Sequence, residues 1–132
     1  MIQEQKDLLL RDLCARLPYE VKVKFGDSKP ATLTVIEHDE FGWQIGSEDE
    51  FGGMITIIDN VKPYLFPLSS MTEEQKKELY NLVEETAFQI IHSEDGSPQP
   101  HIAMDWYNKN HFDYRGFIPM GLAIDATGLN IY

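Results

Sequence analysis

The stretch LLRDLCARLPYEVKVKF, residues 9–25, decides the fold class, because its hydrophobic period changes halfway along. In the first half, apolar residues recur at the spacing of a helix face: Leu9, Leu10, Leu13, Cys14 and Leu17. Pro18 then ends the helix, since proline lacks a backbone N–H and clashes with the preceding turn. In residues 19–25 apolar and polar side chains alternate, which predicts a half-buried strand. The chain therefore opens with a helix followed directly by a strand.

Further short strands are predicted downstream. Residues 31–37 (ATLTVIE) are rich in β-branched side chains and indicate a second strand. The tetrapeptide Asp-Glu-Phe-Gly then occurs at residues 39–42 and again, ten residues later, at residues 49–52. This offset suits successive strands of a meander joined by acidic, glycine-bearing turns. The strands of that meander are predicted at residues 43–45 and 54–58.

The second half of the chain indicates helices. Residues 61–68 (VKPYLFPL) contain two prolines, so we expect an extended connection packed over the sheet. Thr72 and Gln75 have the spacing of a capping box, which predicts the start of a helix. The buried face of that helix is expected to comprise Leu79, Leu82, Val83, Thr86 and Ile90. Glu73 and Lys77 are expected to form an exposed pair on it.

Residues 93–100 (SEDGSPQP) have the composition of a flexible loop, and a short helix is expected at about residues 102–110. A last short strand is expected at residues 122–124. This order predicts a single α+β domain spanning residues 1–132, with an N-terminal helix, an antiparallel sheet of about four short strands, and then two helices. In an alternative arrangement, the strands and the proline-rich segment curl into a small barrel.

The composition favours a cytoplasmic globular protein. Cys14 is the single cysteine, so the chain forms no internal disulfide, which fits a reducing compartment. Its leucine neighbours predict that Cys14 is buried. The N-terminal segment carries charges through its apolar positions, so we expect no secretory signal. No apolar run reaches the ~20 residues that a membrane span needs, so no membrane association is expected.

The net charge of −11 is unevenly distributed. Residues 1–36 contain five acids and six bases, whereas residues 37–132 contain seventeen acids and five bases. The acidic part should repel phosphate, so we expect no direct nucleic-acid binding. A solvated surface explains such charge. A sharper alternative is a surface that imitates nucleic acid, formed by Glu37, Asp39, Glu40, Glu48, Asp49 and Glu50.

Residues 105–115 (DWYNKNHFDYR) combine aromatic rings with groups that hydrogen-bond and carry charge. Aromatic residues together with arginine are typical of the buried centres of protein interfaces. The binding residues predicted on this basis are Trp106, His111, Asp113, Tyr114 and Arg115. In the structural alternative, the rings of Trp106, Phe112 and Tyr114 anchor the C-terminal segment to the sheet.

No catalytic motif accompanies this cluster. His101 and Asp105 lie four residues apart, and a turn could add His111 and Asp113 to form a zinc or iron site. Such spacings are common by chance, so structural or surface roles are favoured for these histidines. Residues 37–48 have the glycine and final acid of a calcium-binding loop, but Phe41 occupies a ligand position. We therefore assign no metal, cofactor or catalytic residue.

Three segments carry a resemblance: residues 13–23 (LCARLPYEVKV), 62–75 (KPYLFPLSSMTEEQ) and 105–127. Together they resemble short proteins encoded by Bacteroides-type gut bacteria and by their phages or mobile elements. The resemblance spans most of the chain and implies a small cytoplasmic protein. No activity is established for that family, so it supplies no catalytic residue. Residues 39–53 depart from the family pattern.

These features favour a non-enzymatic accessory protein of a phage or mobile element that binds another, unidentified protein. One alternative is an acidic nucleic-acid mimic that inhibits a host DNA-handling or defence protein. Another is a small metal-dependent enzyme that uses His101, Asp105, His111 and Asp113.

Overall fold

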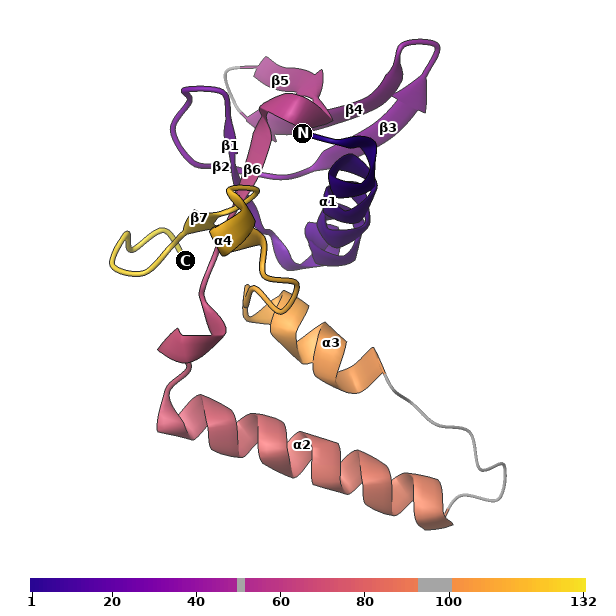
Figure 1. The fold of residues 1–132 in the computed structure, drawn as a ribbon, viewed down its shortest axis with the longest axis vertical. Helices are drawn as coiled ribbons and strands as arrows, with labels where there is room; N and C mark the ends of the chain where they lie inside the picture. The colour runs from indigo at the N-terminus through magenta and orange to yellow at the C-terminus, as the bar shows by residue number, and fades with distance from the viewer. Residues whose placement is uncertain (50–51, 93–100) are drawn as a thin grey trace.

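The structure, a computed structural model, describes residues 1–49, 52–92 and 101–132. The loop predicted at residues 93–100 lies outside them. Helix α1 (Gln3–Arg16) is the predicted N-terminal helix, and a 3-10 turn, η1 (Leu17–Tyr19), follows it at the proline (Figure 1). Glu20 has a left-handed backbone with a φ of 58°, so the first strand, β1 (Lys22–Phe25), begins only after it.

Four strands form a mixed sheet in the order β2–β1–β6–β7. The new members are β2 (Ala31–Thr32), β6 (Val61–Leu65) and β7 (Ile124–Asp125). The expectation that residues 61–68 form a connection over the sheet is wrong, because β6 lies at the centre of the sheet. An entirely antiparallel sheet is also wrong, since β6 is antiparallel to β1 but parallel to β7.

Pro63 fits into this central strand because its position needs no hydrogen bond across the sheet. Asn60 O accepts from the residue after β1, and Leu65 O accepts from the residue after β7, both at 2.8 Å. Backbone groups alternate along a strand, so those of Pro63 point the same way as those of Leu65, toward β7. Pairing with β7 starts only at Tyr64, so the missing N–H costs no hydrogen bond.

The other three strands form an antiparallel meander in the order β3–β4–β5. They are β3 (Val35–Asp39), β4 (Gly42–Asp49) and β5 (Gly52–Ile57). The repeated tetrapeptide explains both hairpins, because Asp39 pairs with Gly42 and Asp49 pairs with Gly52. Gly42 has a φ of +100°, a conformation that other residues rarely adopt. The predicted meander is therefore confirmed.

The α+β class and the order of helix, strands and later helices are confirmed. The later helices are α2 (Glu73–His92), α3 (His101–Lys109) and the short α4 (Phe117–Met120). The described strands form two separate sheets, so neither a single sheet nor a small closed barrel is present among them. Over the same residues, no helix is long and apolar enough to cross a membrane.

Helix α1 supplies the centre of the hydrophobic core. Leu9 and Leu13 are fully buried and cluster with side chains from both sheets and from the C-terminal segment. The other buried members are Val21, Val23, Phe25, Leu33, Ile45, Val61, Leu65, Phe117, Leu122 and Ala123. Cys14, predicted to be buried, is exposed, because the buried side of α1 runs through residues 9, 12, 13 and 16.

The predicted start of α2 is confirmed. Thr72 N donates to Gln75 Oε1 at 2.9 Å, and Gln75 N donates to Thr72 Oγ1 at 3.1 Å, so both halves of the capping box form. The exposed pair predicted for this helix forms with a different lysine, since Glu73 contacts Lys76 at 3.1 Å rather than Lys77.

The predicted buried stripe of α2 is found only in part. Leu79 and Leu82 are half-buried, whereas Val83 is exposed. The side chains of Thr86 and Ile90 lie outside the described part of the chain. Figure 1 shows the reason: α2 runs beside α3 and away from both sheets, and among the described elements α3 is its main contact.

We predict that Leu13→Ala lowers the free energy of unfolding by about 2–5 kcal/mol, because it leaves a cavity beneath both sheets. Cys14→Ala, one position along the helix, is the matched control and should change stability by about 0.5 kcal/mol or less. Urea titration of both variants measures the difference. Equal losses in the two variants would show that α1 is rotated from the orientation described.

Candidate functional site

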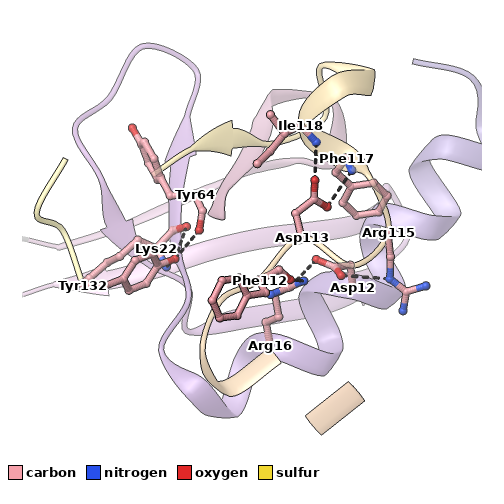
Figure 2. Close-up of polar contacts among 10 residues, drawn as sticks. All are labelled: Asp12, Arg16, Lys22, Tyr64, Phe112, Asp113, Arg115, Phe117, Ile118 and Tyr132. Carbon is pink, nitrogen blue, oxygen red and sulfur yellow. Dashed lines mark hydrogen bonds and ion pairs between the residues drawn. The ribbon is translucent and has the colours of Figure 1, made fainter. Parts of the chain in front are cut away.

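Two charged side chains on α1 face the core. Asp12 and Arg16 lie four residues apart and are fully buried. Arg16 Nε donates to Asp12 Oδ2 at 2.7 Å, and its Nη2 donates to the Phe112 carbonyl at 2.6 Å. Arg115 Nε donates to Asp12 Oδ1 at 3.1 Å (Figure 2). One carboxylate therefore bridges two guanidinium groups and ties α1 to the segment after α3.

This buried triad of Asp12, Arg16 and Arg115 carries a net positive charge. The ring of Tyr114 contacts both cations, with its centroid 5.3 Å from Arg16 Cζ and 5.1 Å from Arg115 Cζ. The electron-rich face of an aromatic ring attracts cations, so Tyr114 offsets part of the excess charge. Sequence reasoning missed the role of Asp12 and Arg16, although both fall on the same helical stripe as Leu9 and Leu13.

Trp106, predicted as a binding residue, is only 5% exposed. Its ring stacks on Phe112 with a centroid distance of 5.6 Å and an interplanar angle of 7°. Its Nε1 donates to Glu78 Oε1, on α2, at 3.0 Å. Trp106 therefore joins α3 to α2 and to the turn that follows α3, so its role is structural, although its contacts are with helices and a turn rather than with the sheet as the structural alternative proposed.

Asp113, also predicted as a binding residue, is buried and turned toward α4. Its Oδ1 accepts from Phe117 N at 2.8 Å, and its Oδ2 accepts from Ile118 N at 2.9 Å. The first N–H groups of a helix have no partner inside the helix. The residue at the cap position, Gly116, has no side chain to satisfy them, so Asp113 does so instead.

His111 connects the cluster to the C-terminal residue. Its backbone is left-handed, with a φ of 63°, and its ring stacks on Tyr132 with a centroid distance of 3.8 Å. The Tyr132 hydroxyl accepts from Lys22 N at 2.8 Å and donates to the Tyr64 carbonyl at 2.6 Å (Figure 2). Burial, together with the charge of Arg16, lowers the pKa of His111 to about 4. The histidine is therefore neutral at physiological pH.

The structure thus brings the five predicted binding residues together, but mostly as an internal junction. Trp106 and Asp113 are buried, while His111, Tyr114 and Arg115 are half-buried. The polar groups of Trp106, Asp113 and Arg115 serve contacts within the chain, whereas His111 Nδ1 and the Tyr114 hydroxyl are buried without a hydrogen-bond partner among the described residues.

The four candidate metal ligands are engaged differently. His111 stacks on the C-terminal tyrosine, Asp113 caps α4, and Asp105 is exposed. The side chain of His101 lies outside the described part. Within that part, no group of three or more His, Cys, Asp or Glu side chains is arranged to hold a metal ion.

The meander presents a more accessible surface. Ile45 is buried in the core and pairs with Ile36 and Thr56, so these three residues share the inner face. Side chains alternate along a strand, so the neighbouring residues form an outer face. On this outer face Ile55 and Ile57 are 56% and 46% exposed.

Two exposed aromatic residues lie at one end of the meander: Phe41 in the β3–β4 turn, and Trp43 in β4, on the same face as Ile45. Phe41 is 80% exposed and Trp43 is 44% exposed. The turn is held by Asp39 Oδ1, which accepts from Phe41 N at 2.8 Å. Trp43 packs edge-on against His38, and both aromatic residues line a pocket of about 350 Å³ between the turn, α1 and the end of β5. Turns rarely carry large apolar side chains, so the position of Phe41 in a predicted turn was a feature of the sequence that could have indicated an exposed contact residue.

Acidic side chains surround these apolar residues. Glu37, Asp39 and Glu48 lie on the outer face, and Glu40 lies in the turn; all four are exposed. None of them forms an ion pair within the described residues. The side chain of Asp49 and all of Glu50 lie outside that part. We call the eight residues Glu37, Asp39, Glu40, Phe41, Trp43, Glu48, Ile55 and Ile57 the meander surface.

Comparisons with protein-family models, with curated proteins and with solved structures found no match. No relative therefore supplies a substrate, a partner or a catalytic residue for this chain. Its function has to be inferred from its own exposed side chains, charges and backbone groups.

We predict that Asp12→Ala lowers the free energy of unfolding by about 3–5 kcal/mol, because it leaves two buried or half-buried guanidinium groups without their carboxylate. The control is Glu73→Ala, which breaks the exposed pair with Lys76 and should cost about 1 kcal/mol or less. Urea titration at neutral pH gives both values. A loss for Asp12→Ala no larger than that of the control would refute the importance of the triad.

His111 predicts a pH dependence of stability. Its folded pKa, about 4, lies below the ordinary value of 6.5, so folding favours the neutral ring. This contribution is complete above pH 6.5 and is lost as the pH falls through 4. Urea titrations across this window should show a smaller decline for His111→Asn, which tolerates the left-handed backbone and does not titrate. Identical pH slopes for the two proteins would contradict the assignment.

Proposed function

We propose that this chain is a non-enzymatic accessory protein that binds another protein through the meander surface. One observation carries the proposal: Phe41, 80% exposed at the tip of a hairpin, lines one pocket with Trp43 and Ile57, two further exposed apolar residues of the same small sheet. Scattered exposed apolar residues are ordinary, but a contiguous group rimmed by charge is typical of interaction sites.

The composition of the meander surface supports this proposal. Large aromatic residues dominate the binding energy of protein interfaces, and Phe41 and Trp43 supply them here. Glu37, Asp39 and Glu48 would form the polar rim. Binding costs the turn that carries Phe41 little conformational entropy, because the hydrogen bond from the Phe41 N–H to Asp39 already orders its backbone.

The half-buried residues of the junction have a supporting role in this proposal. Tyr114 and Arg115 hold the triad together, and the triad fixes α1, whose N-terminal residues line the pocket below Trp43. The resemblance of residues 13–23, 62–75 and 105–127 supports the further proposal that a phage or mobile element encodes the protein.

The acidic residues favour a second candidate function, the imitation of nucleic acid. Glu37, Asp39, Glu40 and Glu48 are exposed and lack ion pairs within the described residues. A mimic would occupy a basic site on a host DNA-handling protein, and its binding would depend strongly on salt. An interface dominated by Phe41 and Trp43 would instead survive high salt.

We predict that Phe41→Ala reduces capture of the protein partner at least tenfold, because it removes the most exposed aromatic contact of the meander surface. The measurement is a pull-down from native host cytosol at low and high salt, quantified by mass spectrometry. Tyr80→Ala is the matched control: Tyr80 is an exposed aromatic residue on α2, and its loss should leave capture unchanged. Equal capture by wild type and Phe41→Ala would rule out this surface.

A further inference from the structure

Strand β5 has a free edge. It pairs with β4 on one side and with no strand on the other among the described residues. Gly46 O accepts from Thr34 N, so the backbone groups of Gly46 point toward β3. Its neighbours in β4 therefore face β5, where they pair with Met54 and Thr56. By alternation, the N–H and C=O groups of residues 53, 55 and 57 point outward, and none of them forms a backbone hydrogen bond with a described residue outside the meander.

This edge lacks the devices that usually prevent pairing with other chains. Natural edge strands are protected by lysine, proline, bulges or a covering element. The sequence of β5, GGMITI, contains no charge and no proline. Met54, Ile55 and Ile57 are all substantially exposed beside the free backbone groups. Both the backbone and the side chains of β5 are therefore suited to receive another strand.

Charge indicates which strand would pair there. Glu48 lies on the same face of the meander as Ile55 and Ile57 and pairs with Gly53, so no side chain of β5 separates it from the free edge. It forms no ion pair within the described residues. A second copy of this chain would bring the same acid and another net charge of −11. A segment with lysine or arginine would instead find the unpaired Glu48 carboxylate within reach of its long side chain.

We infer that β5 is extended by a strand from the partner protein, in a segment that carries apolar and basic residues on the same face. The backbone of that segment would pair with residues 53, 55 and 57, its apolar side chain would contact Ile55 and Ile57, and a basic side chain on the same face would reach Glu48. This inference rests on the proposed function and adds the chemistry and geometry of the partner.

A proline at position 57 tests the free edge selectively. Ile57 has a φ of −85°, close to the value that proline requires, and its N–H points away from β4. Ile57→Pro therefore blocks strand addition while leaving the β4–β5 hydrogen bonds in place. Ile57→Ala is the matched control, because it removes the same side chain but keeps the outward N–H.

The probes are two fluorescent peptides, TKTVTKT and TETVTET, which carry their charged and apolar residues on one face and are titrated against the full chain at low salt with anisotropy as the readout. We expect saturable binding of the basic peptide only, and protection of the amides of residues 53, 55 and 57 from hydrogen exchange. Ile57→Pro should weaken that binding at least tenfold more than Ile57→Ala does. Equal binding of both peptides, no binding of either, or equal effects of the two variants would overturn the inference.

Two further measurements separate this inference from the proposed function. If Phe41→Ala abolishes capture of the cellular partner but Ile57→Pro does not, strand addition is refuted while the meander surface stands. If Phe41→Ala has no effect but Ile57→Pro removes capture, the edge stands without the aromatic site. Analytical ultracentrifugation tests whether a second copy of this chain occupies the edge instead. A dimer that Ile57→Pro dissociates would assign the edge to that second copy and would overturn the inference of a basic partner strand.

Discussion

The carboxylate of Asp12 is the constraint on which the rest of this structure depends. It is fully buried and accepts hydrogen bonds from two arginines that lie 4 and 103 residues away in the chain. A buried charge is tolerated only when it is paired and hydrogen-bonded, so α1 and the segment after α3 must meet at this point. Arg16 extends the link to the Phe112 carbonyl. The aromatic stack of Phe112 and Trp106 then attaches α3 and, through Glu78, α2.

This link explains why the segment richest in chemical groups points inward. Aromatic rings, carboxylates and guanidinium groups are as useful for joining distant parts of a small domain as for binding a partner. Here Trp106, Asp113 and His111 serve α2, α4 and the C-terminal tyrosine respectively. With those residues occupied, the most exposed large apolar residue of the described chain, Phe41, lies on the meander. We therefore propose that residues 105–115 stabilise the fold, whereas the β3–β4–β5 meander binds the partner.

Much of the fold could be predicted from local patterns, whereas the site could not. The change of period in residues 9–25 predicted α1 and β1, and the repeated Asp-Glu-Phe-Gly predicted the meander, because turn and strand chemistry is local. The burial of Asp12 and Arg16 could not be predicted, since a period argument places charges outside and Arg115 is distant in sequence. Likewise the central position of β6 depends on pairing with β7, about sixty residues later. The exposure of Ile55 follows from which face of the meander packs on the core, which only the tertiary structure decides.

The central claim is that residues 105–115 form an internal junction while the meander surface is open to a partner. Hydroxyl-radical footprinting of the free, native chain, read by mass spectrometry, tests it most directly. Each comparison is between two residues of the same type, so their intrinsic reactivities are equal. The account predicts much faster oxidation of Phe41 than of Phe112, and of Trp43 than of Trp106. Faster oxidation of Trp106 and Phe112 would contradict it and would favour residues 105–115 as the binding site.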